Sequence, residues 1–259
     1  MSNLHWKTGI TNVKPNELRV RGYKIDELMG NVTFGQAVYL ALKGELPSKN
    51  EGKLIDAILV SSIDHGATPP STLTAMTVAS TGAPINAAIA SGILAISKFH
   101  GGAIKDCMGV LLQVEDKIKA REISVAVATK ELVDEYKQIR RRISGFGHRI
   151  HTEDPRTKKL FQLAQELGIR DTFTKIARGI ESELEAQSGK KLPINVDGAI
   201  AAMLCELDFP PKLANVFFMI ARLPGLAAHA YEEQTRFKPM RAIHPKDHEY
   251  DGPDDRSIQ

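Results

Sequence analysis

Apolar residues recur every three to four positions along most of this chain, the spacing that places them on one face of an α-helix. The first such stretch begins after Thr33, a good N-cap, and stops at Gly44. Ser48 precedes a second stretch, which runs to Ser62. We expect further helices over residues 68–81, 83–98, 103–116, 124–142, 156–167, 171–188, 197–206 and 211–234. The pattern therefore predicts an all-α fold.

Four segments depart from a simple amphipathic helix. Residues 1–15 are polar and irregular, and residues 18–26 fit a short strand pair that turns at Gly22. The segment 83–98 is apolar nearly all round, which is typical of a helix buried on every side. Its small residues predict close packing, either in the domain centre or at a subunit interface. We expect the polar tail from Lys238 to lie over the surface or over a partner.

Composition and charge narrow the class of protein. The chain has 259 residues, of which 42% are hydrophobic and 25% are charged, so one large or two modest globular domains are expected. A net charge of +3, with basic residues scattered apart from residues 140–142, argues against nucleic acid and for a small-molecule partner.

Cysteine usage and the apolar runs bear on the compartment. The two cysteines, Cys107 and Cys205, lack metal-ligand spacing and indicate a reducing cytoplasm. No run reaches the roughly 18 apolar residues that span a bilayer, and residues 1–7 lack a signal-peptide core. We therefore expect a cytoplasmic protein that contacts no membrane.

The stretch 144–156, which reads SGFGHRIHTEDPR, is the first candidate site. Two glycines bracket Phe146, so the backbone there is free to adopt a positive φ or to approach a ligand closely. His148 follows, and Asp154 is a good N-cap for the next helix. A histidine on a tight turn with Arg156 close by is typical of a site for a small anion. A surface histidine beside solvated arginines is an equally good interpretation of this stretch.

Three histidines and one aspartate share a local setting. His65, His100 and His148 each lie beside a glycine at a predicted helix end, and Asp197 lies where a loop becomes a helix. Helix ends leave backbone groups unpaired and direct side chains and dipoles into one cleft. Each residue alone is more often a cap or a surface group. Together, a carboxylate and two histidines suit proton abstraction beside a carbonyl, with one base and two groups that stabilise an oxyanion.

These segments resemble the three catalytic segments of citrate synthases, in the same order. They read HGGA from His100, GFGH up to His148 followed by DPR at 154–156, and NVD up to Asp197. The stretches RGYKIDEL from Arg21 and YLALKGELP from Tyr39 are similar to the amino-terminal pattern of that family.

The resemblance runs from about residue 22 to 245 and implies a fold and an assembly. It implies an all-helical homodimer or higher homo-oligomer with a large and a small domain in each chain, and the active site in the cleft between them. The large domain would contain residues 1–104 and 205–259, and the small domain residues 105–204.

The resemblance also implies a role for each site residue. Asp197 would exchange the proton on the methyl carbon of acetyl-CoA, and His100 would stabilise the enolate. His148 would bind the oxaloacetate carbonyl. The substrate carboxylates would be held by His65, Arg156 and Arg222. No metal and no tightly bound cofactor is required, because the coenzyme A thioester is itself a substrate.

Departures from the synthase pattern favour one branch of the family. The arginine-proline-arginine of citrate synthases, which reaches the partner's site, reads IHPK at 243–246. Arg241 and His244, in this tail, are expected to bind substrate, and the tail is expected to bring Arg241 or His244 into the neighbouring subunit's site. DHG at 64–66 and HPKDHEY at 244–250 look more like the carboxy-terminal citryl-CoA lyase module of ATP-citrate lyase and its stand-alone relatives.

The expected activity is therefore that of a citryl-CoA lyase. Such an enzyme cleaves citryl-CoA to acetyl-CoA and oxaloacetate by a retro-Claisen reaction. A citrate synthase, or a related enzyme that condenses an acyl-CoA with a 2-oxo acid, is the alternative. A non-catalytic CoA-binding subunit is a third interpretation, and the intact His100, His148 and Asp197 argue against it.

Overall fold

The chain begins with a small antiparallel sheet of order β1-β2-β3. The structure, a computed structural model, describes residues 6–147, 153–242, 245–254 and 256–258. Its strands are β1 (Thr11–Lys14), β2 (Glu17–Val20) and β3 (Tyr23–Lys24). Arg21 and Gly22, between β2 and β3, have φ of 50° and 89°, as a tight hairpin turn requires. The strand pair predicted around Gly22 is confirmed, and β1 lies where irregular chain was expected.

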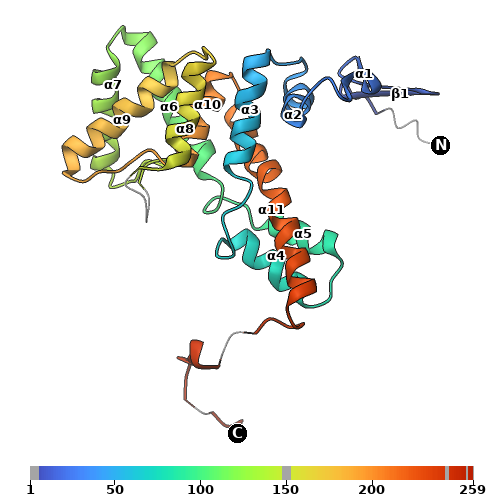
Figure 1. The fold of residues 1–259 in the computed structure, drawn as a ribbon. Helices are drawn as coiled ribbons and strands as arrows, with labels where there is room; N and C mark the ends of the chain where they lie inside the picture. The colour runs from blue at the N-terminus through green and yellow to red at the C-terminus, as the bar shows by residue number, and fades with distance from the viewer. Residues whose placement is uncertain (1–5, 148–152, 243–244, 255, 259) are drawn as a thin grey trace.

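Helices form most of the remaining described chain (Figure 1). They are α1 (Ile25–Leu28), α2 (Phe34–Lys43), α3 (Lys49–Ser61), α4 (Pro70–Ser80), α5 (Ile85–Leu94), α6 (Ala103–Arg121), α7 (Val125–Gln138), α8 (Pro155–Glu166), α9 (Thr172–Ser188), α10 (Val196–Glu206) and α11 (Ala214–Arg236). Two short 3₁₀ helices are η1 (Pro211–Leu213) and η2 (Pro245–Asp247). The predicted mostly helical fold is confirmed.

Local capping chemistry explains where several helices begin. Thr33 and Ser48 each form a capping box, in which the cap and the third helical residue exchange side-chain and backbone hydrogen bonds. Gly44 ends α2 in the left-handed region, with φ of 95°. Asp154 and Asn195 cap α8 and α10 through their side chains. These last two caps matter for function, because both helices begin with candidate site residues.

Helix α10 forms the centre of the helical body. Every residue from Gly198 to Glu206 is buried, and α10 packs against α6, α8 and α9. Helix α11 runs out of this body with α4 and α5 packed beside it, as Figure 1 shows. The amino-terminal strands project on another side, and the carboxy-terminal tail leaves the far end of α11. We refer to α4, α5 and α11 together as the arm.

Helix α5 departs from its prediction. It was expected to be buried on every side, yet only Ala88 and Gly92 of its ten residues are buried in this chain. Leu94, at its end, is 82% exposed. Packing against α4 and α11 covers one face only. Burial in the domain centre is therefore wrong, and burial at a subunit interface stays a prediction.

The helical stretch Pro211–Arg236 is apolar for a structural reason. By length and composition it is the one helix in the described ranges that would be able to cross a membrane, although 44% of its most apolar window is buried inside the protein. It also carries two buried charged residues, Arg222 and Glu233. Helix α11 packs against α3, α4, α5 and α6, and its buried residues include Phe217, Ala221 and Leu226.

Glu206, at the end of α10, is a buried carboxylate that holds the start of α9. One of its oxygens accepts the backbone N–H groups of Phe173 at 2.7 Å and Thr174 at 3.1 Å. The other lies 3.3 Å from Nε of Arg170. Burial raises the pKa of Glu206 from 4.5 to about 7 in spite of these partners.

The first prediction concerns the pH dependence of stability. Because the folded pKa of Glu206 lies above the unfolded value, the folded state keeps this proton where the unfolded state has lost it. The free energy of unfolding should therefore fall as pH rises from about 4.5 to about 7, and this component should be absent in Glu206→Gln. Urea denaturation at pH 5 and pH 8 measures it, with exposed Glu185→Gln as control. An equal change in Glu206→Gln and wild type would contradict the prediction.

Candidate active site

One buried carboxylate joins the starts of α8 and α10. Asp154 is 1% exposed and receives the backbone N–H of Arg156 at 3.0 Å and that of Val196 at 3.2 Å. The Arg156 guanidinium donates to both carboxylate oxygens, at 3.0 and 2.9 Å. Burial acts to raise the pKa of Asp154, but these hydrogen bonds outweigh it and the pKa lies below its usual value. Arg156 is thereby held in one orientation beside α10.

Asp197 lies in the first turn of α10, close to two arginines. Burial raises the pKa of its carboxyl group. The positive charges of Arg156 from α8 and Arg222 from α11 act in the opposite direction. Three helices thus direct charged side chains to one place, and Asp197 has the raised pKa that suits a proton carrier.

Arg222 is a buried arginine with an unused donor. It is 3% exposed, its Nε donates to the Ser62 carbonyl at 3.0 Å, and its guanidinium lies over the Phe218 ring at 4.9 Å. One terminal nitrogen, Nη1, has no hydrogen-bond partner among the residues that the structure describes. Buried donors in native proteins are nearly always paired. This nitrogen is therefore suited to a carboxylate of a bound ligand.

His100 lies in the turn before α6 and contacts α4 and α11. Its Nε2 is 2.7 Å from Oγ of Ser71, and its ring meets Phe218 edge-on at a centroid distance of 5.7 Å. Burial, helped by the charge of Arg222, lowers the pKa of the imidazole. Gly101 has φ of 86°, and a Cβ there would lie 2.8 Å from Phe218. The glycine after the histidine is thus required by space and backbone conformation.

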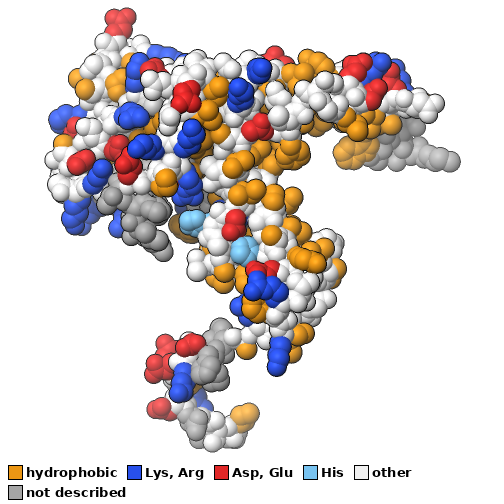
Figure 2. Space-filling view, viewed as in Figure 1, with side chains coloured by type: hydrophobic (Ala, Val, Ile, Leu, Met, Phe, Trp, Pro, Cys, Tyr) orange, Lys and Arg blue, Asp and Glu red, His pale blue; other side chains and the backbone are white. Residues whose placement is uncertain are grey.

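His65 lies in the segment between α3 and α4. Although exposed in the single chain, it has a pKa that is lowered by partial desolvation and then by the charges of Arg156 and Arg222. The mutual electrostatic effects show that five predicted site residues lie close in space. They are His65, His100, Arg156, Arg222 and Asp197. Figure 2 shows histidine side chains where the helical body meets the arm and on the adjacent face of the arm.

The glycine turn before His148 is tied to the segment before Asp197. The Asn195 side chain donates to the Gly147 carbonyl at 2.9 Å, and its backbone N–H donates to the Gly145 carbonyl at 3.0 Å. Both glycines have positive φ, near 90°, as predicted. His148 itself lies outside the described residues, and so does His244.

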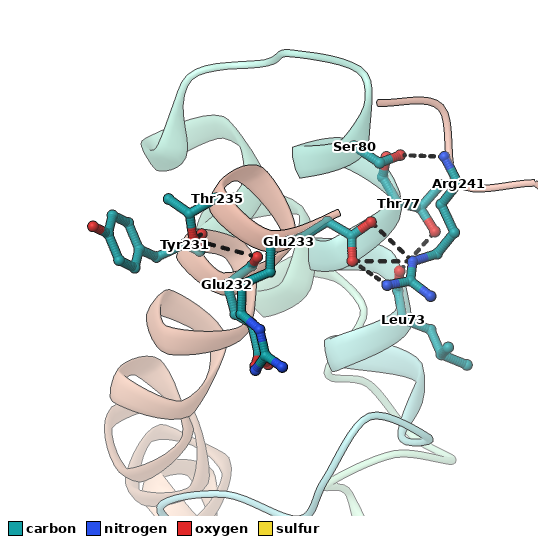
Figure 3. Close-up of polar contacts among 9 residues, drawn as sticks. Leu73, Thr77, Ser80, Tyr231, Glu232, Glu233, Thr235 and Arg241 are labelled. Atoms are coloured by element: carbon teal, nitrogen blue, oxygen red, sulfur yellow. Dashed lines mark hydrogen bonds and ion pairs between the residues drawn. The ribbon is translucent and has the colours of Figure 1, made fainter. Parts of the chain in front are cut away.

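Arg241 is not brought together with these residues in its own chain. As Figure 3 shows, its guanidinium pairs with the buried carboxylate of Glu233, and its backbone N–H donates to Oγ of Ser80 at 3.2 Å. Glu233 lies about 16 Å further along α11 than Arg222, at 1.5 Å per residue. The role of Arg241 in a neighbouring subunit's site stays a prediction.

Sequence reasoning missed several contacts that shape the site. It identified Asp154 only as a cap, and it gave no role to Ser71, Asn195 or His229. His229, on α11, lies 3.1 Å from the carboxylate of Asp64, the residue before His65. For Asn195 the local signal was its place in the pattern NVD. For His229 the signal was indirect, because its partner Asp64 directly precedes the candidate His65.

A cavity of about 720 Å³ opens beside the glycine turn, between α7 and α9. Its lining combines basic and apolar side chains, including Lys137, Arg141, Arg142, Phe146 and Leu192. Such a lining suits a ligand with both phosphate and apolar parts. Within the described ranges, no three His, Cys, Asp or Glu side chains come together as metal ligands do.

The second prediction tests Asp154. Asp154→Ala leaves the Arg156 guanidinium without its partner and removes the cap of α8. We expect the free energy of unfolding to fall by about 3 kcal/mol, as when one partner of a buried ion pair is removed. Urea denaturation measures this, and exposed Glu153→Ala should stay within about 0.5 kcal/mol of wild type. A loss in Asp154→Ala no larger than in that control would contradict the role of Asp154.

Comparison with known proteins places this arrangement in a family. Residues 48–246 match the family described as citrate synthase, C-terminal domain. Putative citrate synthase 2 of Mycobacterium tuberculosis is 32% identical over 200 residues, which cover 75% of this chain and 51% of that protein. The chain thus spans about half the length of the curated relatives it matches.

Solved structures extend the similarity to nearly the whole chain. Citryl-CoA lyase from Hydrogenobacter thermophilus has 43% identity and a TM-score of 0.89, covering 98% of this chain and 97% of that one. ATP citrate lyase from Methanothrix soehngenii, in complex with citrate and coenzyme A, shares the fold at 20% identity with a TM-score of 0.86. That match covers 100% of this chain and 44% of the ATP citrate lyase chain. On the family match and these similarities, the chain belongs to the citrate synthase family.

Proposed function

We propose that the protein is a citryl-CoA lyase, which cleaves citryl-CoA to acetyl-CoA and oxaloacetate. The observation that carries the proposal is the buried Arg222 with its unused donor, beside Arg156, Asp197 and His100. The similarity to a citryl-CoA lyase along 98% of this chain and 97% of that one supports cleavage, whereas the match to the curated synthase covers only 51% of its length.

The cationic groups of the cleft suit the carboxylates of a citryl group. Arg222 offers an unpaired buried N–H, and the planar guanidinium of Arg156 is oriented by Asp154. Arginine suits this task because its donors match both oxygens of a carboxylate. His65 adds a neutral imidazole, since its pKa is lowered. These three residues would hold the oxaloacetate half of the substrate.

The cleavage step needs a base, an acid and a group that stabilises an enolate. His148 would take the proton of the citryl hydroxyl as the carbon–carbon bond breaks and the oxaloacetate carbonyl forms. The electron pair of that bond passes to the acetyl part as an enolate, whose oxygen His100 would hydrogen-bond. Asp197 would then give its proton to the methylene carbon, and its raised pKa favours the form that carries this proton.

The cavity beside the glycine turn supports a coenzyme A thioester as substrate. Lys137, Arg141 and Arg142 would bind phosphate groups, while Phe146 and Leu192 offer apolar contacts. Gly147, also in its lining, directly precedes His148 in the chain. The thioester end would thus enter the cleft from this side.

The third prediction tests the proposed reaction directly. Purified protein is incubated with synthetic citryl-CoA, and acetyl-CoA, oxaloacetate, citrate and free CoA are quantified from one sample under initial-rate conditions. A lyase yields mainly acetyl-CoA and oxaloacetate. Hydrolysis instead needs a water aimed at the thioester and stabilisation of a second tetrahedral oxyanion. Citrate and free CoA as main products would mean a compact citrate synthase.

The fourth prediction concerns the proton carrier. Asp197→Asn keeps the shape of the side chain but removes its acid–base function, so turnover of citryl-CoA should drop by roughly 10²–10⁴-fold with folding intact. Asp116→Asn, an exposed position on α6, is the matched control and should retain wild-type turnover. Near wild-type turnover in Asp197→Asn would refute the assignment.

We also propose that the chain works as a homodimer or a higher homo-oligomer. Large apolar side chains on the arm and on the segment after α5 are exposed in the single chain, including Leu94 at 82%, Phe99 at 96% and Tyr231 at 63%. Large apolar side chains that are exposed in a single chain are typical of a protein–protein interface when they form a patch. The arm lies next to His100, so a second chain seated on it would adjoin the site.

The fifth prediction follows from that assembly. If Arg241 serves the neighbouring subunit, mixing inactive Asp197→Asn chains with inactive Arg241→Ala chains should restore part of the activity, because mixed dimers contain one intact site. Unfolding and refolding the mixture with distinguishable tags makes mixed dimers, and the lyase assay measures recovery. No recovery in demonstrably mixed dimers would show that Arg241 does not act across the interface.

A further inference from the structure

His229 on α11 forms a contact that the proposed mechanism does not use. Its Nε2 lies 3.1 Å from Oδ1 of Asp64, and the other oxygen of Asp64 accepts the backbone N–H of Gly66 at 2.9 Å. Asp64 is therefore held on both sides. Between Asp64 and Gly66 lies His65, the imidazole that we place against the substrate.

The contact of His229 is one of three that a single face of α11 makes with the same segment. Arg222, Gly225 and His229 are spaced three and four residues apart, so they lie on one side of the helix. Arg222 donates to the Ser62 carbonyl at 3.0 Å. At Gly225 a Cβ would lie 2.4 Å from the Ile63 carbonyl oxygen, so only glycine lets the two backbones approach this closely.

The order of these contacts along the chain fixes the position of His65 relative to α11. Successive positions along α11 meet Ser62, Ile63 and Asp64 in order, and His65 is the next residue. Arg222 thus both anchors this segment and offers its free nitrogen to the ligand. A shift at Asp64 would change the separation between the His65 imidazole and the Arg222 guanidinium, and with it the fit to a carboxylate.

We propose that His229 is a positioning residue, which acts through Asp64 to set where His65 stands beside Arg222. The inference rests on the proposed function, because it takes His65 as a ligand of the oxaloacetate half of citryl-CoA. His229 touches neither that half nor the breaking bond in this account. Its loss should therefore weaken substrate binding more than it slows the bond-breaking step.

A pair of amide variants tests this with closely matched chemistry. His229→Gln carries an N–H donor at about the reach of Nε2, whereas His229→Asn is one methylene shorter and cannot reach Asp64. We expect His229→Asn to raise the KM for citryl-CoA by about 10-fold with kcat within about threefold, as loss of one charge-assisted hydrogen bond implies. His229→Gln should keep both constants within about threefold of wild type.

Two readouts separate positioning from general stability and from failure of the proposed function. Hydrogen exchange of the Gly66 amide should speed up in His229→Asn and not in His229→Gln, and it needs no substrate. If the wild type cleaves no citryl-CoA, the proposed function fails. The exchange rate of the Gly66 amide still tests whether His229 holds Asp64 in place. His229→Leu replaces His229→Asn if that variant does not fold.

Several outcomes would overturn the inference. One is an unchanged KM in His229→Asn together with wild-type exchange at Gly66. Another is a fall in kcat with KM unchanged, which would place His229 in the chemical step. Equal damage from the Gln and Asn variants would show that the reach to Asp64 is not what matters.

Discussion

The site depends on the buried carboxylate of Asp154. It caps α8, accepts Nε and Nη2 of Arg156 on its two oxygens and accepts the first backbone N–H of α10. Because this one side chain joins the starts of two helices, it fixes the position of Arg156 on α8 relative to Asp197 on α10. A bidentate pair gives geometric specificity as well as energy, which is what orientation of a substrate carboxylate requires.

The second constraint is a buried arginine, Arg222, that forms no ion pair with a carboxylate in the described chain. Asp154 neutralises Arg156, whereas Arg222 is paired with a carbonyl and an aromatic ring. Desolvation lowers the pKa values of His65 and His100, helped at His65 by Arg156 and Arg222 and at His100 by Arg222, so both favour the neutral imidazole. In the proposed reaction, a neutral imidazole would stabilise the enolate by hydrogen bonding, and the arginines would pair with the substrate carboxylates.

Much of the fold follows from local chemistry that the sequence displays. Thr33, Ser48 and Asp154 start helices, and Gly44 stops one, because caps involve residues within one turn of each other. The strand β1 was missed because its residues are exposed and polar on average, so no apolar alternation marks it. The exposure of α5 was also missed, since apolar composition does not say whether the covering surface belongs to the same chain.

For the site, the sequence by itself determined the kinds of residue and their local settings: histidines beside glycines, and Asp197 in a capped first turn. Only the tertiary structure decided the partners. Ser71 meets His100, His229 meets Asp64, and Arg241 pairs with Glu233 instead of joining the cleft of its own chain. The first two pairs join residues far apart in the chain. All three contacts depend on how α4 and α11 pack. No local pattern encodes that packing, because it depends on the buried surface of the whole arm.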